Sequence, residues 1–382
     1  MSHLQEQSFY KLLQSEMPDN RSVIGRKHEL AFVLIGFVLG ILNRRESQLS
    51  IVRYMKNNLP FLGELTNQKV QKSVSAPQLG RILRGVNLLK LNELCIQSFG
   101  KGILQLPNSE WVAIDGKELR GTIESEKSTR GEALVYAVSH QTGAIVEQTF
   151  YQGHKESEKL AVRKLLEESG LQGKSVTLDA LHCDPTTLSQ LERHHGTYLT
   201  QAKDNQEDLV KNLKSKERRF APVYTRKTVE KGHGRLEIRN HNVYNIENEL
   251  FGKRWEDSHL RTLIVVERES TILKTKKVLK ETSYYITNRS AMVETDQTGL
   301  DLTNAVRGHW SIEASNYRRD VTFNEDHIRI RNPNAARVYA VLLSLAMCCL
   351  NQITFSNTVE QLELFIDSKS SFALFLNQIG FV

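Results

Sequence analysis

Cysteine, targeting signals and long apolar runs are scarce or missing in this sequence. Four of the 382 residues are cysteine, and two of these, Cys348 and Cys349, are adjacent. The first residues, MSHLQEQSFYKLL, lack the basic-then-apolar pattern of a secretory signal. We therefore expect reduced thiols and a cytoplasmic location. The longest apolar run, Leu30–Leu42, is 13 residues long, short of the ~20 that span a membrane, so we expect a buried helix and no membrane partner.

The composition is that of a folded globular chain. Apolar residues make up 40% and charged residues 25%, which excludes disordered and collagen-like classes. The length predicts two or three units. The net charge of +7 is moderate, but residues 201–240 hold eleven Lys or Arg against six Asp or Glu. That stretch is the first place to look for phosphate contacts.

Changes in hydrophobic periodicity divide the chain into four parts. Helical spacing dominates residues 1–106, with helices expected at Glu29–Arg45, Gln48–Lys56 and Ser75–Ser98. Residues 107–203 form the first part of an α/β core, 204–300 a β-rich insertion, and 301–382 the helices that complete the core. No internal repeat is evident.

The α/β core is predicted from alternating strand and helix patterns. Strands are expected at Trp111–Ile114, Ala133–Ser139, Ala144–Tyr151 and Ser175–Leu178, with a helix at Glu156–Ser169 before the last of these. This order gives a hairpin plus one crossover, which makes the first and fourth strands neighbours. In the closing region, helices are expected at Asp301–Arg319 and Asn334–Ile353.

Three acidic residues stand where a metal site would use them. Asp115 ends the first strand, Asp179 ends the fourth, and Glu313 lies on a late helix. Few, hard oxygen ligands suit Mg²⁺ or Mn²⁺, and two such ions serve in-line phosphodiester displacement. Taken singly, each Asp is equally a turn or cap residue, and Glu313 a solvated helix residue. Val306, Trp310 and Tyr317 share the helix face of Glu313, so its carboxylate needs a compensating partner. His309, one turn earlier, is a candidate either for that partner or for a donor to phosphate.

Further residues are candidates for DNA contact, each with a structural alternative. Lys117 and Arg120 follow Asp115 and either neutralise a phosphate or form a solvated turn. His182 either donates to the scissile phosphate or orients Asp179. Lys203 stands at the end of a fifth short strand expected at Thr197–Gln201 and is a candidate phosphate contact. Zinc is not expected from the His and Cys spacing. In the β-rich part the candidates for backbone contacts are Lys227, Lys231, Arg235 and Arg239.

Five motifs in sequence carry a family resemblance. They are AIDGKELRGT (113–122), VTLDALHC (176–183), AKDNQ (202–206), KGHGRLEIR (231–239), and RGHWSIE with DVTFNED (307–313 and 320–326). In this order they resemble the H-repeat-associated, ISAs-type insertion-sequence transposases. The resemblance implies a DDE-class enzyme with an RNase H-like core, in which Asp115, Asp179 and Glu313 form the catalytic and metal-binding triad.

The motifs depart from the family pattern at several positions. Ala314 stands where Asn usually follows the Glu, and 155–158 read Lys-Glu-Ser-Glu where the family has Lys-Ser-Asn-Glu. A related Tyr-Arg-Glu-Lys signature is not intact, since its other positions hold Val306, His309 and Asp320. The three carboxylates are nevertheless all present.

The function implied is a bacterial DNA transposase. It would cut double-stranded DNA at the terminal inverted repeats of its element, with two Mg²⁺ or Mn²⁺ ions, and join the freed 3′-OH to target DNA. Two joined ends need two active sites, so we expect a homodimer on DNA, at the nucleoid in the cytoplasm. The alternatives are a related nuclease without strand transfer and a domesticated DNA-binding protein.

Overall fold

The N-terminal part is a cluster of helices whose ends follow local capping signals. The computed structural model describes residues 7–24, 26–100, 106–107, 109–123, 131–152, 155–232 and 234–382. The side chain of Ser47 caps one helix and that of Asn87 another. The predicted helix Ser75–Ser98 is therefore two helices, because Asn87 starts a new one. These helices are α1 (Phe9–Glu16), α2 (Leu30–Leu42), α3 (Gln48–Asn57), α4 (Leu59–Thr66), α5 (Ala76–Gly85) and α6 (Leu88–Phe99).

The described strands form one nine-stranded sheet in the order β3-β2-β1-β4-β5-β9-β8-β7-β6. Strands β1, β4 and β5 run parallel, and the other neighbours are antiparallel. The expected hairpin and crossover are both present, and the α/β, RNase H-like fold class is confirmed. The strands are β1 (Trp111–Glu118), β2 (Glu132–Ser139), β3 (Ile145–Gln152), β4 (Ser175–Leu178), β5 (Thr197–Ala202), β6 (Tyr224–Gly232), β7 (Arg235–Asn245), β8 (Thr262–Ile272) and β9 (Val278–Thr287).

Helices cover both faces of this sheet. On one face α7 (Lys155–Ser169), α8 (Pro185–Arg193) and α9 (Glu207–Arg219) enclose an apolar core against β1, β4 and β5. On the other face lie α10 (Thr295–Gly308), α11 (Trp310–Tyr317), a π-helical turn (Arg318–Thr322) and α12 (Pro333–Leu350). Successive residues of a strand point to opposite faces, so alternate β1 side chains enter the two cores.

The N-terminal and C-terminal helices share one apolar core. Helix α12 is buried along most of its length among α2, α5 and α6, and residues of α13 (Thr358–Asp367) and α14 (Lys369–Gln378) join the same cluster. Among the described helices, α12 alone is long and apolar enough to cross a membrane, but 83% of that stretch is buried inside the protein. Such burial is expected of a core helix.

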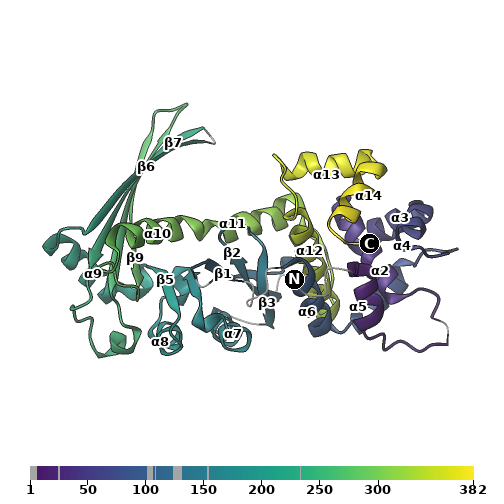
Figure 1. Ribbon diagram of the computed structural model, residues 1–382, viewed down its shortest axis with the longest axis horizontal. Helices are drawn as coiled ribbons and strands as arrows, with labels where there is room; N and C mark the ends of the chain where they lie inside the picture. Colours follow the sequence, from purple (N-terminus) through teal and green to yellow (C-terminus); the bar gives the residue numbers. More distant parts are fainter. Residues whose placement is uncertain are drawn as a thin grey trace.

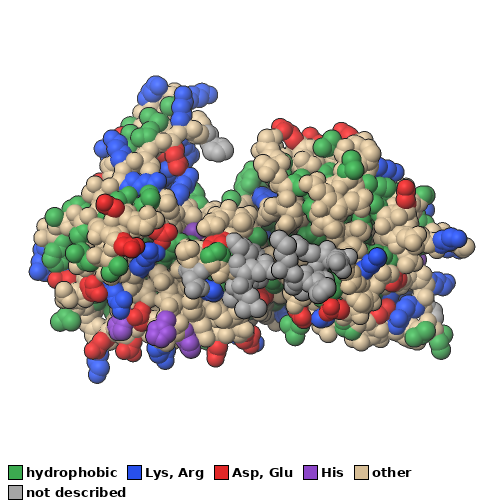
Figure 2. Space-filling view, viewed as in Figure 1, with side chains coloured by type: hydrophobic (Ala, Val, Ile, Leu, Met, Phe, Trp, Pro, Cys, Tyr) green, Lys and Arg blue, Asp and Glu red, His purple; other side chains and the backbone are tan. Residues whose placement is uncertain are grey.

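The sheet extends beyond the core as a projecting arm. Figure 1 shows β6 and β7 rising from the body of the molecule, and we call this hairpin the arm. Most side chains of β6 are exposed. On the other side of α10 and α11, the helices α13 and α14 rise in the same direction as the arm, and Figure 2 shows a notch between the two.

Several element boundaries differ from those predicted. Strand β1 continues to Glu118, so Asp115 lies within the strand and not at its end. The expected helix Asp301–Arg319 begins at Thr295 and is divided at His309 into α10 and α11. Helix α9 occupies part of the basic stretch that had shown a strand pattern, and α13 and α14 were not anticipated.

Candidate active site

Asp115 and Asp179 come together because β1 and β4 are parallel neighbours. Ile114 pairs with Leu178 across these strands, so each Asp is the next residue along its chain. Ile114 and Leu178 point into the core under α7 and α8, so both Asp side chains belong to the opposite face, which α11 covers. Both line a cavity of about 400 Å³ that Glu313 also lines.

The surroundings of Asp115 disfavour its charged form. Burial, together with the nearby carboxylates of Asp179 and Glu158, raises the pKa of Asp115 to about 7. The side-chain amide of Asn316, on α11, donates a hydrogen bond to Oδ2 of Asp115 over 3.1 Å. This bond links β1 directly to the helix that carries Glu313.

Asp179 is held by the backbone turn that follows it. Its Oδ1 accepts hydrogen bonds from the backbone N–H groups of Leu181 at 2.9 Å and His182 at 3.4 Å. The cap interpretation of this Asp is therefore correct for one oxygen. The side chain is still 42% exposed, which leaves the carboxylate accessible from the cavity.

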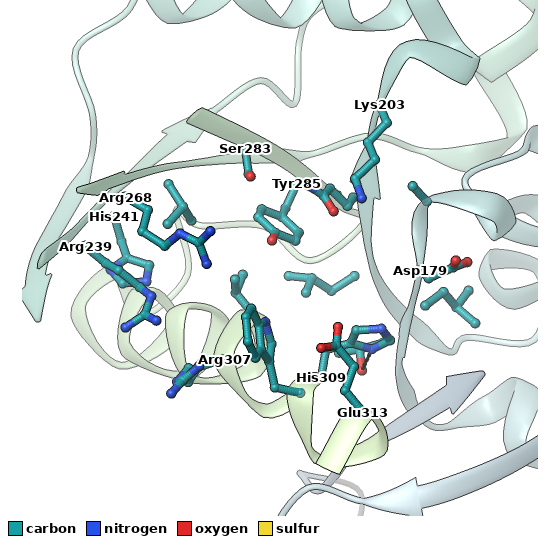
Figure 3. Close-up of a pocket in the computed structure, with 18 of the residues that line it drawn as sticks. Asp179, Lys203, Arg239, His241, Arg268, Ser283, Tyr285, Arg307, His309 and Glu313 are labelled. Atoms are coloured by element: carbon teal, nitrogen blue, oxygen red, sulfur yellow. Dashed lines mark hydrogen bonds between the residues drawn. The ribbon is translucent and has the colours of Figure 1, made fainter. Parts of the chain in front are cut away.

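Glu313 occupies a more open position than its sequence neighbours suggested. It lies in the first turn of α11 and is exposed, and Trp310 and Tyr317 beside it are 43% and 63% exposed. The predicted apolar surroundings are wrong, because this part of the helix faces the cavity mouth. Figure 3 shows the Glu313 carboxylate next to the His309 ring, with Asp179 on the far side of that ring.

His309 belongs to a buried chain of polar groups. The hydroxyl of Thr177 lies 2.9 Å from Nδ1 of His309 and 2.9 Å from Nε2 of His140. Burial lowers the pKa of His309 to about 4 and that of His140 to about 3, so both rings are neutral at pH 7. Because the hydroxyl has one hydrogen, it cannot donate to both rings. The sequence analysis missed Thr177 and His140, although Thr177 shares the strand face of Asp179.

His182 is fully buried and cannot reach a substrate from this position. Its Nε2 lies 3.4 Å from Oε1 of Glu158 and 3.8 Å from Oδ1 of Asp179. Of the two predicted roles, the geometry favours support of Asp179. Glu158, on α7, was not among the predicted site residues. A signal was present in the sequence, because Glu158 stands where the family segment Lys-Ser-Asn-Glu has its Glu.

A divalent cation suits this set of side chains. Carboxylate oxygens are the ligands that Mg²⁺ and Mn²⁺ prefer, and a cation here would relieve the repulsion that raises the pKa of Asp115. Within the described part of the chain, no three His, Cys, Asp or Glu side chains are already grouped closely enough to hold a metal ion. The carboxylate ligands therefore fit the ion chemically, but Glu313 does not lie close enough to both aspartates to complete a three-carboxylate group.

Comparison with known proteins decides the family. Residues 108–349 match the family model described as a transposase DDE domain. The chain belongs to this DDE transposase family. It is 27% identical over 340 residues to the Escherichia coli K12 protein named "H repeat-associated putative transposase YhhI". The aligned region covers 87% of this chain and 88% of the relative. "Putative protein YbfL" of the same organism shows the same identity and coverage. The resemblance to H-repeat-associated transposases is thereby confirmed. Membership of this family implies use of a divalent metal.

Lys117 of the DDE domain is neutralised by protein carboxylates. Its ammonium group lies 2.5 Å from Asp320, 3.3 Å from Asp326 and 3.9 Å from Glu325, and its side chain is 7% exposed. A phosphate would have to displace these partners. Arg120 differs, since its side chain is 73% exposed and its contact with Asp326 is a loose 3.7 Å.

The predicted basic residues divide into exposed and buried ones. Lys203 is exposed at the cavity, and Lys227, Lys231 and Arg235 are exposed on the arm. Arg239 is buried and paired with Glu230, at 2.9 Å, and with Glu237. In Figure 2, blue Lys and Arg side chains gather on the arm.

Two arginines that the sequence analysis did not select also line the cavity. Arg268 is 2.8 Å from Glu281, and Arg307 is 3.0 Å from Glu230 and lies over the Trp310 ring. Figure 3 shows both guanidinium groups on the cavity wall away from Asp179. The cavity thus has an acidic end at β1 and β4 and a basic end under the arm.

Proposed function

We propose that this DDE transposase cuts DNA at the ends of its element and joins the freed 3′ ends to target DNA. The observation that carries the proposal is the pair of neighbouring aspartates on β1 and β4, which share a cavity with Glu313 of α11. In the first step a water oxygen attacks phosphorus and the 3′ oxygen leaves. In the second, that 3′-OH attacks the phosphorus of a target phosphodiester, the new P–O bond forms, and the 3′ oxygen of the target strand leaves.

Asp115, Asp179 and Glu313 would hold two Mg²⁺ or Mn²⁺ ions. When bound, such ions act as Lewis acids that stabilise charge on the attacking and leaving oxygens. The raised pKa of Asp115 supports this assignment, because clustered carboxylates are typical of catalytic sites. Glu313 would approach the two aspartates when α11 moves toward β1 on substrate binding. The hydrogen bond from Asn316 to Asp115 already ties α11 to β1.

The remaining cavity residues would bind and orient the DNA backbone. His309, neutral and fixed through Thr177, is suited to donate to a phosphate oxygen without adding a positive charge beside the metal ligands. Lys203 lies at the cavity and would neutralise a neighbouring phosphate. The exposed Lys227, Lys231 and Arg235 would extend that contact along the arm, and Arg120 is free enough to join it.

Assembly and location follow from the reaction. Joining two ends needs two active sites, so the active species would be a homodimer on double-stranded DNA that carries the inverted repeats. The substrate places this work at the nucleoid in the bacterial cytoplasm.

Cleavage assays on DNA that carries the element ends test the proposal. Asp115→Asn, Asp179→Asn and Glu313→Gln should each lower cleavage in Mg²⁺ or Mn²⁺ by at least ~10²–10³-fold, since each removes a group that acts on the transition state. DNA binding should persist, because phosphate contacts supply most of it. Glu167→Gln, an exposed residue of α7, is the matched control.

Two outcomes would require a different function. Cleavage without joining of the 3′ ends would favour the nuclease alternative. If the wild-type protein binds the end DNA but cleaves it in neither metal, the DNA-binding alternative is favoured. Normal cleavage by Glu313→Gln alone would show that another acid completes the triad.

A further inference from the structure

A second cavity lies where the chain enters helix α2. It measures about 360 Å³, and residues 27–32 and 68–72 contribute its lining. Helix α2 lies at the end of the molecule opposite the arm (Figure 1). It is 13 residues long, and Glu29 at its N-cap makes no side-chain hydrogen bond to the helix. The free N–H groups and the dipole at this helix end favour a negative charge in the cavity.

Three lysine side chains surround this cavity without a counter-charge. Lys27, Lys69 and Lys72 belong to its lining and are exposed, and none of them forms an ion pair within the described part of the chain. Glu29 is the one carboxylate in the lining. It accepts two hydrogen bonds, of 2.7 Å and 2.8 Å, from side chains of α1, so it is already held there. The lining therefore carries a net positive charge.

A buried histidine lines the same cavity. His28 is 8% exposed, and its Nδ1 has no hydrogen-bond partner among the described residues. Burial, together with the nearby charges of Arg21 and Lys27, lowers the pKa of His28, so the ring is neutral at pH 7. A neutral ring carries one hydrogen. Because a buried N–H without a partner is tolerated less well than a buried acceptor, we place that hydrogen on Nε2, as a donor for a ligand in the cavity.

We propose that this cavity binds a backbone phosphate of DNA, with charge from Lys27, Lys69 and Lys72 and a hydrogen bond from the neutral His28 ring. The proposal rests on the proposed function, because it assigns a further contact to the same DNA substrate. A phosphate group has enough acceptor oxygens to take a ring N–H, a helix end and ammonium groups together. None of these groups reads a base edge, so the site would hold duplex DNA of any sequence.

Fluorescence anisotropy of the full chain with labelled end DNA, at pH 7.5 and several salt concentrations, tests the three lysines. The variant that replaces all three with glutamine should bind about 10-fold more weakly at low salt. Its log–log salt slope should fall by up to about 3, since each phosphate contact contributes about one unit. The control makes the same charge change at exposed residues of the same helical cluster that do not line the cavity, and should bind like the wild type. These control substitutions are Lys11→Gln, Arg53→Gln and Lys56→Gln.

Substitutions of His28 test the neutral donor separately from the charges. His28→Phe keeps a ring but removes both nitrogens, so it should weaken binding about 5-fold or more at every salt concentration. The salt slope should stay at the wild-type value, because a neutral donor releases no counterion. His28→Gln places an N–H near the position of Nε2 and should restore part of the affinity. The melting temperature of each variant verifies folding.

The outcomes separate this proposal from the proposed function. Losses in the cavity variants no larger than in the control would overturn the phosphate site, while DNA binding by the wild type would leave the proposed function intact. Failure of the wild type to bind end DNA would overturn the proposed function itself. Inorganic phosphate supplies the last comparison. If it shifts the His28 ring resonances in the NMR spectrum while the cavity variants bind DNA normally, the cavity takes a small phosphorylated ligand, and the assignment to DNA is wrong.

Discussion

At the scale of single residues, the site is defined by carboxylates that the fold buries close to one another, so that their negative charges repel. The pKa of Asp115 is raised from 3.8 to about 7, first by burial and then by Asp179 and Glu158. A side chain with such a shift costs stability whenever it is ionised in the folded protein. The energy stored in this way is available to whichever ligand neutralises the cluster.

The cost should appear as a pH dependence of stability in metal-free protein. Between about pH 4 and pH 7 the folded state binds a proton at Asp115 that the unfolded state has released, so stability falls as pH rises through this window. Asp115→Asn should therefore raise the free energy of unfolding at pH 8, by up to ~4 kcal/mol for about three pKa units. The gain should vanish near pH 4. Urea unfolding in EDTA measures it.

Two controls define this result. Asp208→Asn, an exposed residue of α9, should change stability little at either pH. Addition of Mn²⁺ to the wild type should recover stability at pH 8, since a cation favours the ionised carboxylates. A gain in Asp115→Asn of equal size at pH 4 and pH 8 would contradict the electrostatic explanation.

How far sequence could predict the site depends on how each residue reaches it. Asp115 and Asp179 were predictable because strand order and register follow from local patterns, and the parallel pair then aligns them. The position of Glu158 beside β1 was not, because it depends on how α7 packs across β1 and on the missing side chain of Gly116. The surroundings of Glu313 were misjudged for a related reason, since helical periodicity shows which residues share a face but not what covers that face.

At the scale of elements, α11 is fastened to the protein at its C-terminal end. Arg319, in the π-helical turn, makes two hydrogen bonds of 2.9 Å to Glu325 and further bonds to the Ser344 hydroxyl and the Ala340 carbonyl of α12. Both members of the ion pair are buried. Sequence patterns did not predict the π-helical turn, because it depends on these contacts with residues far along the chain.

Breaking this pair should destabilise the protein strongly. Glu325→Gln leaves the buried Arg319 guanidinium without its counter-charge, which typically costs ~3–5 kcal/mol. Glu269→Gln removes one member of an exposed pair with Lys280, which should cost no more than ~1 kcal/mol. Urea denaturation of both variants measures the difference. A cost below that of the Glu269 control would mean that α12 holds the turn without the ion pair.

At the scale of the whole molecule, the arm and the C-terminal helices rise on either side of α10 and α11 (Figure 1). The exposed basic residues of the arm make it a candidate part of the DNA path. Sequence predicted the β-rich composition of this part and its strands, but not that they continue the core sheet, because strand pairing over long separations leaves no local pattern. The continuous sheet connects the arm through β8 and β9 to β5 and so to the cavity.

Neutralising the exposed arm residues should weaken DNA binding through lost phosphate contacts. We expect the triple variant Lys227→Gln, Lys231→Gln and Arg235→Gln to bind end DNA more weakly. Its affinity should also depend less on salt, with the log–log slope reduced by up to about 3. Arg239 is left unchanged, because it is buried and paired with Glu230 and Glu237. Fluorescence anisotropy at several salt concentrations measures both quantities.

The matched control places the same charge change on the face of the sheet that α7, α8 and α9 cover, away from the cavity. Lys164, Arg193 and Lys211 are exposed on α7, α8 and α9, and their triple glutamine variant alters net charge by the same amount. If the two triple variants lose affinity equally, net charge and not the arm governs binding. If neither loses affinity, the DNA path avoids the arm and has to be sought along the N-terminal helices. Only a selective loss in the arm variant, with a smaller salt slope, locates backbone contacts beside the acidic cavity, where a phosphodiester must lie to be cut.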